Sequence, residues 1–315
     1  MKKTKLSLIL SGLLIVTAVI VASCKKSSTT TTPTPAQDTN TTSTTDNNLA
    51  QQSAHDVTNI GSQGIENDNG SLSTYRLAGG GLVSPQSASV TVNIGARNMT
   101  VTFNNTPGPD GHVRNGTVFY DWSSSPSNVS WFRDAGLILK VSTPYNDYTV
   151  DGNNIKINKK TIRNLGAISG NYTWSDTSNI TITKPGVTTP IQWQGNWTTT
   201  LLNTNNYPYN GTLYNGVYPN STNGLTFIDW AHAIVSVSGN FSGTASDGET
   251  YTGNISSPLV LNLNCSPSGT KYVYVAGVLN FTPTGKATRT INYGSGTCDL
   301  TCVVSIGSFS VTLTL

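Results

Sequence analysis

The chain has 315 residues, of which 10% are charged, and its formal net charge is +3. The first 23 residues contain three lysines and no acid, so the remainder carries 15 basic and 15 acidic residues. A neutral chain with so few charges lacks the electrostatic attraction on which binding to nucleic acid or to anionic lipid depends. Thr, Asn, Ser and Gly take the place of charged residues, which favours an extracytoplasmic β protein.

The first 23 residues predict a lipoprotein signal peptide. Three lysines precede an uncharged run over residues 6–22, which is short for the roughly 20 residues of a bilayer-spanning helix. The run ends in Val21-Ala22-Ser23-Cys24, small residues before a cysteine at a processing site. We therefore expect Cys24 to carry acyl chains, palmitate among them, that anchor the protein to a membrane of the bacterial cell envelope. The expected place is the outer membrane, on either its periplasmic or its surface face.

Residues 24–45 predict a disordered tether, because they are Thr, Ser and Pro with almost no apolar side chain. A flexible chain of that length reaches on the order of 25 Å. Residues 46–71 predict a short helix and a linker. Asp46 is the expected N-cap of a helix over 46–66, which we expect to dock on the β body through a weak apolar stripe.

From residue 72 to residue 315 the hydrophobic period is two. Alternating apolar residues at 90–94 and at 99–103 predict a hairpin, as do those on either side of Asp151-Gly152. Seven Asn-Gly or Asp-Gly pairs supply tight turns. No helical crossover separates the strands, so we predict an all-β fold, an extended antiparallel sheet or sandwich built from hairpins, with one short N-terminal helix. Further strands are expected at 179–183, 191–201, 225–237, 259–263, 272–281, 288–293 and 308–313.

The body contains one short internal repeat. Phe-x-Asp-Trp occurs at residues 119–122 and again at 227–230. The repeat is compatible with two halves divided near residues 185–190, or with one body in which two strand ends match by chance.

The second half of the chain resembles a family of uncharacterised exported lipoproteins of the Bacteroidota type. The resemblance is carried by residues 283–299, Pro-Thr-Gly-Lys-Ala-Thr-Arg-Thr-Ile-Asn-Tyr-Gly-Ser-Gly-Thr-Cys-Asp, with Gly239, Gly243, Gly248-Glu249-Thr250-Tyr251 and Leu263-Asn264-Cys265 upstream. It implies a lipidated cysteine, a polar tether, a short helix and a long all-β body, and it implies no activity. The chain departs from the family at residues 87–89 and 107–112, where it lacks a cysteine pair.

Three cysteines remain after Cys24, and an exported protein can form disulfides. The family pattern carries cysteines at the positions of Cys265 and Cys298 but not at that of Cys302. In one extended strand Cys298 and Cys302 would lie roughly 13 Å apart, which is too far for a disulfide unless a turn separates them. We therefore expect a Cys265–Cys298 bond, with Cys302 a buried apolar residue.

Catalytic and metal-binding patterns are weak, and we expect neither an enzyme nor a cofactor. His55, His112 and His232 are scattered, and the one acidic partner considered for them is Asp229, near His232. The body has a single glutamate, Glu249, so the paired carboxylates of a glycosidase are not evident. No C-x-x-C pair occurs and the three histidines are scattered, so we expect no metal.

The aromatic residues are the remaining indication of a ligand. Most are Tyr or Trp, whose rings can stack on sugars, although cross-strand packing is the favoured explanation for most of them. The loop-like stretch at 207–218 is the exception, and the candidate glycan contacts are Tyr207, Tyr209, Tyr214 and Tyr218. The leading hypothesis is a membrane-anchored envelope lipoprotein that presents a non-enzymatic β scaffold, either structural or for contact with another envelope protein. The alternative is a surface glycan-binding lipoprotein.

Overall fold

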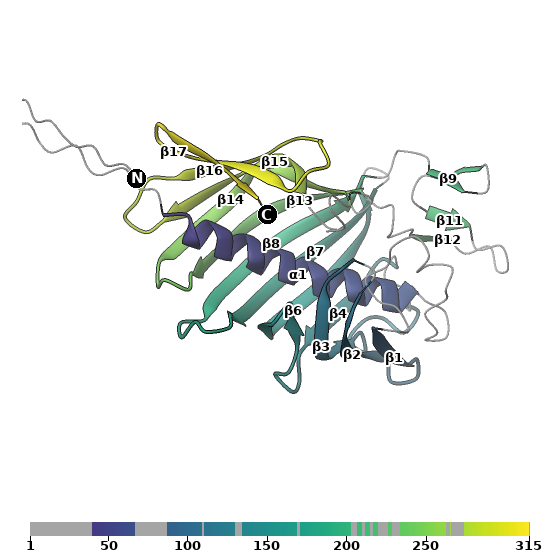
Figure 1. The fold of residues 1–315 in the computed structure, drawn as a ribbon. Helices are drawn as coiled ribbons and strands as arrows, with labels where there is room; N and C mark the ends of the chain where they lie inside the picture. The colour runs from purple at the N-terminus through teal and green to yellow at the C-terminus, as the bar shows by residue number, and fades with distance from the viewer. Residues whose placement is uncertain are drawn as a thin grey trace, which may run out of the picture. The chain divides into compact units, whose positions relative to one another are not determined.

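The computed structural model describes residues 40–66, 87–108, 110–129, 134–168, 171–202, 234–262, 265 and 274–314, together with the backbone of four short strands between 203 and 233. One helix, α1 (Thr42–Glu66), precedes all the strands (Figure 1). Among these residues no helix is both long and apolar enough to cross a bilayer.

Fourteen strands form one antiparallel sheet. Most neighbours in the sheet are also neighbours in sequence, as expected for a chain of hairpins. The order is β1-β2-β3-β4-β6-β7-β8-β13-β14-β15-β16-β17-β18, with β5 beside β3 and β6. The strands are β1 (Ala88–Asn93), β2 (Asn98–Pro107), β3 (Val113–Asp121), β4 (Ile138–Ser142), β5 (Thr149–Val150), β6 (Asn153–Ile168), β7 (Asn171–Thr183), β8 (Ile191–Leu201), β13 (Ile234–Thr244), β14 (Thr250–Asn262), β15 (Tyr274–Pro283), β16 (Arg289–Ser295), β17 (Thr301–Ile306) and β18 (Phe309–Thr314).

The all-β class and the hairpin construction are confirmed. β1 pairs with β2 so that Val90 faces Val101, and the Asp151-Gly152 turn joins β5 to β6. Both residues of this turn have positive φ, 48° and 80°, as a type I′ turn requires. The loop at 184–190 links β7 to β8, which pair with each other, so the sheet runs without a break past the point where two halves were considered.

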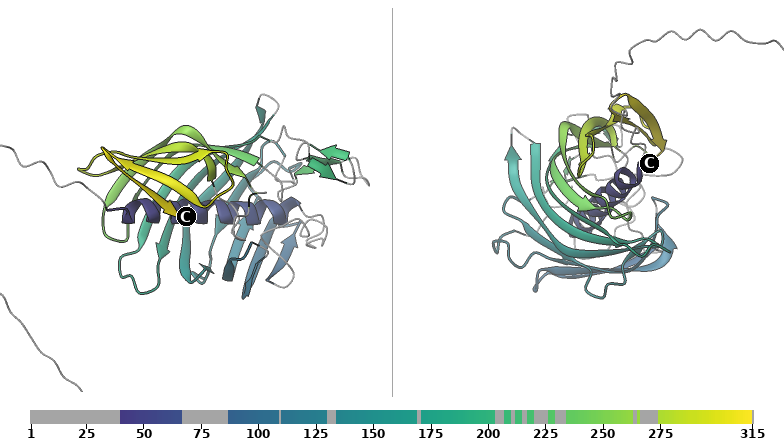
Figure 2. Two further views of the ribbon diagram at one scale, coloured as in Figure 1. Left: turned by 45° about the horizontal axis from the view of Figure 1, so that its top comes forward. Right: turned by 90° about the vertical axis from the view of Figure 1, so that its left-hand side faces the viewer.

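Helix α1 lies against the inner face of the sheet, which curves around it (Figure 2). The inner face is apolar because alternate residues of each strand point toward the helix. In β8, for example, Ile191, Trp193 and Trp197 are buried and the residues between them are exposed, with the exception of Gly195. The helix adds Ala50, Ala54, Val57 and Ile60 to the same core.

The predicted start of the helix is wrong. The helix begins at Thr42, so residues 42–45 of the predicted tether belong to it. Asp46 is not the N-cap. It lies inside the helix, and the side chain of Asn40 instead accepts a hydrogen bond from the backbone N–H of Thr42 at 2.9 Å. Ser and Thr are poor helix formers, and contacts with the sheet override that preference here.

One glycine in the helix has a packing role. A Cβ atom at Gly61 would lie 2.4 Å from the ring of Tyr120 in β3. The missing side chain lets this ring reach the helix backbone, where the Tyr120 hydroxyl donates to the carbonyl of Val57 at 2.8 Å. Helix propensity is lost at this position, and close packing with the sheet is gained.

Candidate functional site

The first turns of α1 are tied to loops at one end of the sheet. Asp46 accepts a hydrogen bond from Lys184 Nζ at 2.6 Å and another from the backbone N–H of Ser246 at 2.7 Å. Ser43 accepts from Arg289 at 2.8 Å and donates to Glu249. All of these contacts join residues at least 138 positions apart in sequence.

The middle of α1 lies beside a second buried ion pair. Lys160 and Asp176 form a salt bridge on the inner face of β6 and β7, and Lys160 also donates to Ser178 at 2.8 Å. The helix joins this pair through Thr58, which donates to Asp176 at 3.2 Å. Burial lowers the pKa of Lys160, and the neighbouring carboxylate offsets part of that shift.

Asp56, also in the middle of α1 and two residues before Thr58, belongs to a third charged cluster. Arg114 in β3 is 1% exposed and binds two carboxylates, that of Asp56 in the helix at 2.5 and 3.0 Å and that of Asp110 at 2.6 and 3.0 Å. Burial alone lowers the pKa of Arg114, but the two carboxylates raise it above its ordinary value. Tyr148 also donates to Asp56, at 3.1 Å.

In these three clusters, buried charged side chains of the sheet and its loops bind α1 and fix its position. Glu249, the one glutamate of the body, pairs with Arg289 and Lys286. Sequence reasoning missed one acid–histidine pair, His112 and Asp151. Its Nδ1 and Oδ2 atoms lie 2.6 Å apart. Asp151 also accepts a hydrogen bond from the backbone N–H of Val113, so the pair holds the β5–β6 turn against β3. Its members are 39 residues apart in separate turns, so no local pattern marks it.

His55 is a titratable group on α1 that is buried in the core. Its ring centroid lies 5.8 Å from that of Trp197 and 6.0 Å from that of Tyr274. Desolvation by burial, with a smaller effect of Lys160, lowers the pKa of His55 from 6.5 to about 4, while Asp176 opposes the shift. The ring is therefore neutral in the folded protein at ordinary pH.

This lowered pKa predicts acid sensitivity. In the unfolded chain His55 takes up a proton below pH 6.5, whereas in the folded chain it does so only near pH 4. The unfolded state thus binds more protons between pH 6.5 and 4, and stability falls as the pH falls through that window. We expect the loss to be about 3 kcal/mol. Urea denaturation across this range should show a shallower pH dependence for His55→Gln than for the wild type, and identical slopes would contradict the assignment.

The tryptophans considered as a glycan platform are packing residues wherever the structure describes them. Trp122, Trp174, Trp193 and Trp197 are each 4% exposed or less. Trp193 and Trp197 stack over Gly195, with ring centroids 5.5 Å apart, and Trp197 stacks in turn on Phe241. The polar edge of Trp193 is used internally, because its indole N–H donates to Asn47 of α1 at 3.1 Å.

The tyrosine-rich stretch is described only in its backbone. Short strands β9 (Tyr207–Tyr209) and β10 (Thr212–Tyr214) form a hairpin in which Tyr207 is opposite Tyr214. Tyr218 lies in β11 (Val217–Pro219), which pairs with β12 (Thr226–Ile228). The side chains of the four candidate tyrosines, and the Asp229–His232 pair, lie outside the described residues, so their roles stay predictions.

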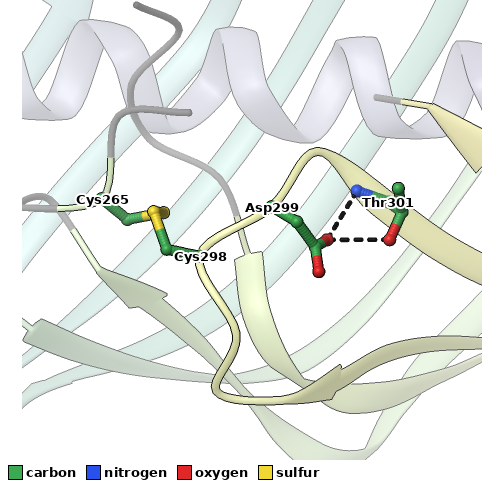
Figure 3. The surroundings of a disulfide bond; sticks show 4 residues. All are labelled: Cys265, Cys298, Asp299 and Thr301. Carbon is green, nitrogen blue, oxygen red and sulfur yellow. Dashed lines mark hydrogen bonds between the residues drawn. A yellow bond between two sulfur atoms is a disulfide. The ribbon is translucent and has the colours of Figure 1, made fainter. Parts of the chain in front are cut away.

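The disulfide is confirmed. Cys265 and Cys298 are bonded, and their Cα atoms lie 5.5 Å apart (Figure 3). Next to the bond, Asp299 accepts hydrogen bonds from the backbone N–H and the hydroxyl of Thr301, both at 2.8 Å, which fixes the turn into β17. Cys302 is a free, buried thiol, as expected. Desolvation by burial raises its pKa to about 11, so it stays protonated and unreactive.

The outer face of the sheet, turned away from α1, is polar and hollowed at its centre. Two adjoining hollows of about 350 and 620 Å³ cross β7, β8, β13 and β14. Most of the lining residues carry amides or hydroxyls; the others are glycines, the aromatic residues Trp193, Phe241 and Tyr251, and one charged residue, Lys159. The residues common to both hollows are Asn179, Gln194, Ser242 and Thr252. This arrangement can accept and donate hydrogen bonds but holds no acid–base pair.

In the part of the chain that the structure describes, no group of three His, Cys, Asp or Glu side chains is placed to hold a metal ion. Comparison with known proteins adds no constraint. No family model, curated protein or solved structure matches the chain. The resemblance to exported lipoproteins therefore stays an expectation from the sequence.

Proposed function

We propose that the protein is a lipid-anchored lipoprotein of the bacterial cell envelope that presents its sheet as a non-catalytic scaffold. The anchor is Cys24, and the polar residues after it lead directly into α1. The scaffold stands on the periplasmic face or on the surface face of the outer membrane. The neutral charge of the mature chain argues against nucleic acid as a partner.

The observation that carries this proposal is the position of α1. A tether that ended in a surface helix would hold the body through weak contacts. Here the first helix after the tether lies in the core and is bound to the sheet near its start, by Lys184–Asp46, and in its middle, by Arg114–Asp56 and Thr58–Asp176. A pull on the tether is thereby shared across strands from β3 to β16, as a tethered scaffold requires.

The lipid anchor is tested by Cys24→Ala. Without the thiol no diacylglyceryl group can be added, so we expect an unprocessed precursor that takes up no labelled palmitate. The wild type should be labelled and should fractionate with the envelope. Cys302→Ala is the matched control, because it removes a different thiol and should leave labelling unchanged. A wild type that takes up no label would overturn the proposal.

A second function, glycan binding, is favoured by the hollow on the outer face. Sugar hydroxyls both donate and accept hydrogen bonds, and so do the amides and hydroxyls that line the hollow. The buried tryptophans no longer support this function, so the outer face replaces them as the place where a glycan would bind.

A further inference from the structure

The outer face carries three rows of uncharged polar side chains that run across the strands. Residues directly opposite each other in an antiparallel pair project on the same face, so each row follows from the strand register. The first row is Thr181, Gln192, Thr244 and Thr250; the second is Asn179, Gln194, Ser242, Thr252 and Thr282; the third is Thr161, Thr177, Asn196, Asn240, Asn254, Asn280, Thr290, Ser305 and Ser310. We call these rows the polar ladders.

The side chains of the ladders bond to one another and keep capacity for a ligand. Gln194 donates one of its two N–H bonds to Ser242 at 2.9 Å, and Thr181 donates to Gln192 at 2.8 Å. An amide has two donors and two acceptor sites, so each of these exposed glutamines retains unused groups that face solvent. The ladders are thus preorganised rows of donors and acceptors.

The chemistry of the ladders excludes several kinds of partner. Lysines occur only at one end, where Lys156 is opposite Thr181 and Lys159 is opposite Asn179, so the face offers little to nucleic acid or to an acidic chain. Protein interfaces are enriched in aromatic residues, Met and Arg, and the ladders contain none of these. The ladders contain no apolar side chains, so this face is not suited to bind the apolar part of a membrane. The class of partner that fits the ladders is therefore an uncharged, hydroxyl-rich polymer.

The dimensions favour an extended ligand. Neighbouring strands lie about 4.8 Å apart, so the second ladder, which crosses five strands from β7 to β15, is roughly 20 Å long. Successive ladders are two residues apart along each strand, or about 6.6 Å. Three parallel rows of this length match a chain that lies flat across the strands better than they match a single small molecule.

We propose that the hollow across β7, β8, β13 and β14 binds a neutral polysaccharide, extended along the polar ladders. The inference rests on the glycan-binding function proposed above and assigns its ligand class and its site. Contacts with several sugar units, each by ordinary hydrogen bonds, would supply the affinity. Because neither partner is charged, binding should be almost independent of salt.

The test uses the mature lipoprotein in detergent micelles and soluble dextran, mannan, xylan and polygalacturonate as probes. We expect binding to at least one of the three neutral polymers and none to polygalacturonate. Gln194→Ala combined with Asn196→Ala should weaken that binding about tenfold, the loss expected for two hydrogen-bonding groups of ordinary strength. Asn115→Ala, an exposed asparagine of β3 outside the hollow, is the matched control and should bind as the wild type does.

The possible outcomes distinguish an error in the proposed binding site from an error in the proposed glycan-binding function. If the hollow variant binds as the wild type does while Tyr209→Ala with Tyr214→Ala abolishes binding, the protein binds glycans but the proposed site is wrong. If no neutral polymer binds, or only polygalacturonate binds, the inference and the glycan-binding function both fall. The scaffold proposal is judged separately, by palmitate labelling at Cys24. Matching melting temperatures of the variants would show that lost binding is not lost folding.

Discussion

Arg114→Ala is expected to lower the free energy of unfolding by about 3–5 kcal/mol. The substitution leaves the carboxylates of Asp56 and Asp110 in a buried site without their cation. Desolvated, unpaired charges are among the most destabilising defects known in proteins. Since Asp56 belongs to α1 and Arg114 to β3, the loss should also loosen the middle of the helix.

Denaturant titration of Arg114→Ala and Arg163→Ala measures this effect. Arg163 is an exposed arginine of β6, so removing it should change stability by no more than about 0.5 kcal/mol. A second variant, Arg114→Ala with Asp56→Asn, should recover part of the loss, because it removes one of the two stranded charges. Equal stability of Arg114→Ala and Arg163→Ala would mean that the cluster does not hold the helix.

Loss of the Cys265–Cys298 bond is expected to cost about 3–4 kcal/mol of stability. The two cysteines are 33 residues apart, and a bond that closes a loop of this size removes a corresponding amount of entropy from the unfolded chain. The bond also joins the segment after β14 to the start of the β17–β18 hairpin at the edge of the sheet. We therefore expect β17 and β18 to be the first strands to lose protection when it is cut.

Adding a reductant distinguishes the contribution of this bond to stability from that of the free thiol, Cys302. The wild type and Cys302→Ala should both lose about 3–4 kcal/mol in dithiothreitol, whereas Cys265→Ala with Cys298→Ala should be insensitive to it. If the double variant still responds to reductant, or if the wild type does not, the assigned bond is not the stabilising one.

Sequence patterns located the hairpins because their signal is local. Alternation together with tight-turn residues placed β8 at residues 191–201, where the structure has it. Strand β17 was missed, since its core residues, Cys302, Val304 and Ile306, are separated by valine and serine and give little contrast. The disulfide was expected mainly through the resemblance, and spacing alone would have left Cys302 as an alternative partner.

The helix was predicted from its apolar stripe, but the charged clusters that hold it could not be predicted locally. A β-bulge between Ile157 and Lys159 shifts the alternation of β6, so that Lys160 points into the core beside Asp176. Without the bulge the pattern would expose Lys160. The helix itself is held by residues more than 50 positions away in sequence, and such contacts leave no periodic signal. Its buried polar residues, such as Asn47, Gln51 and Asn59, weakened the apolar stripe by which it was recognised.

The position of α1 inside the curved sheet is the central claim, since both the scaffold and the direction of the outer face depend on it. Native-state hydrogen exchange of the mature protein tests it most directly, because amides are protected by burial and stable hydrogen bonds. We predict that the amides of residues 46–60 exchange as slowly as those of β7 and β8. Exchange of these helix amides at the rate of unprotected amides, with β7 and β8 still protected, would contradict this position of the helix.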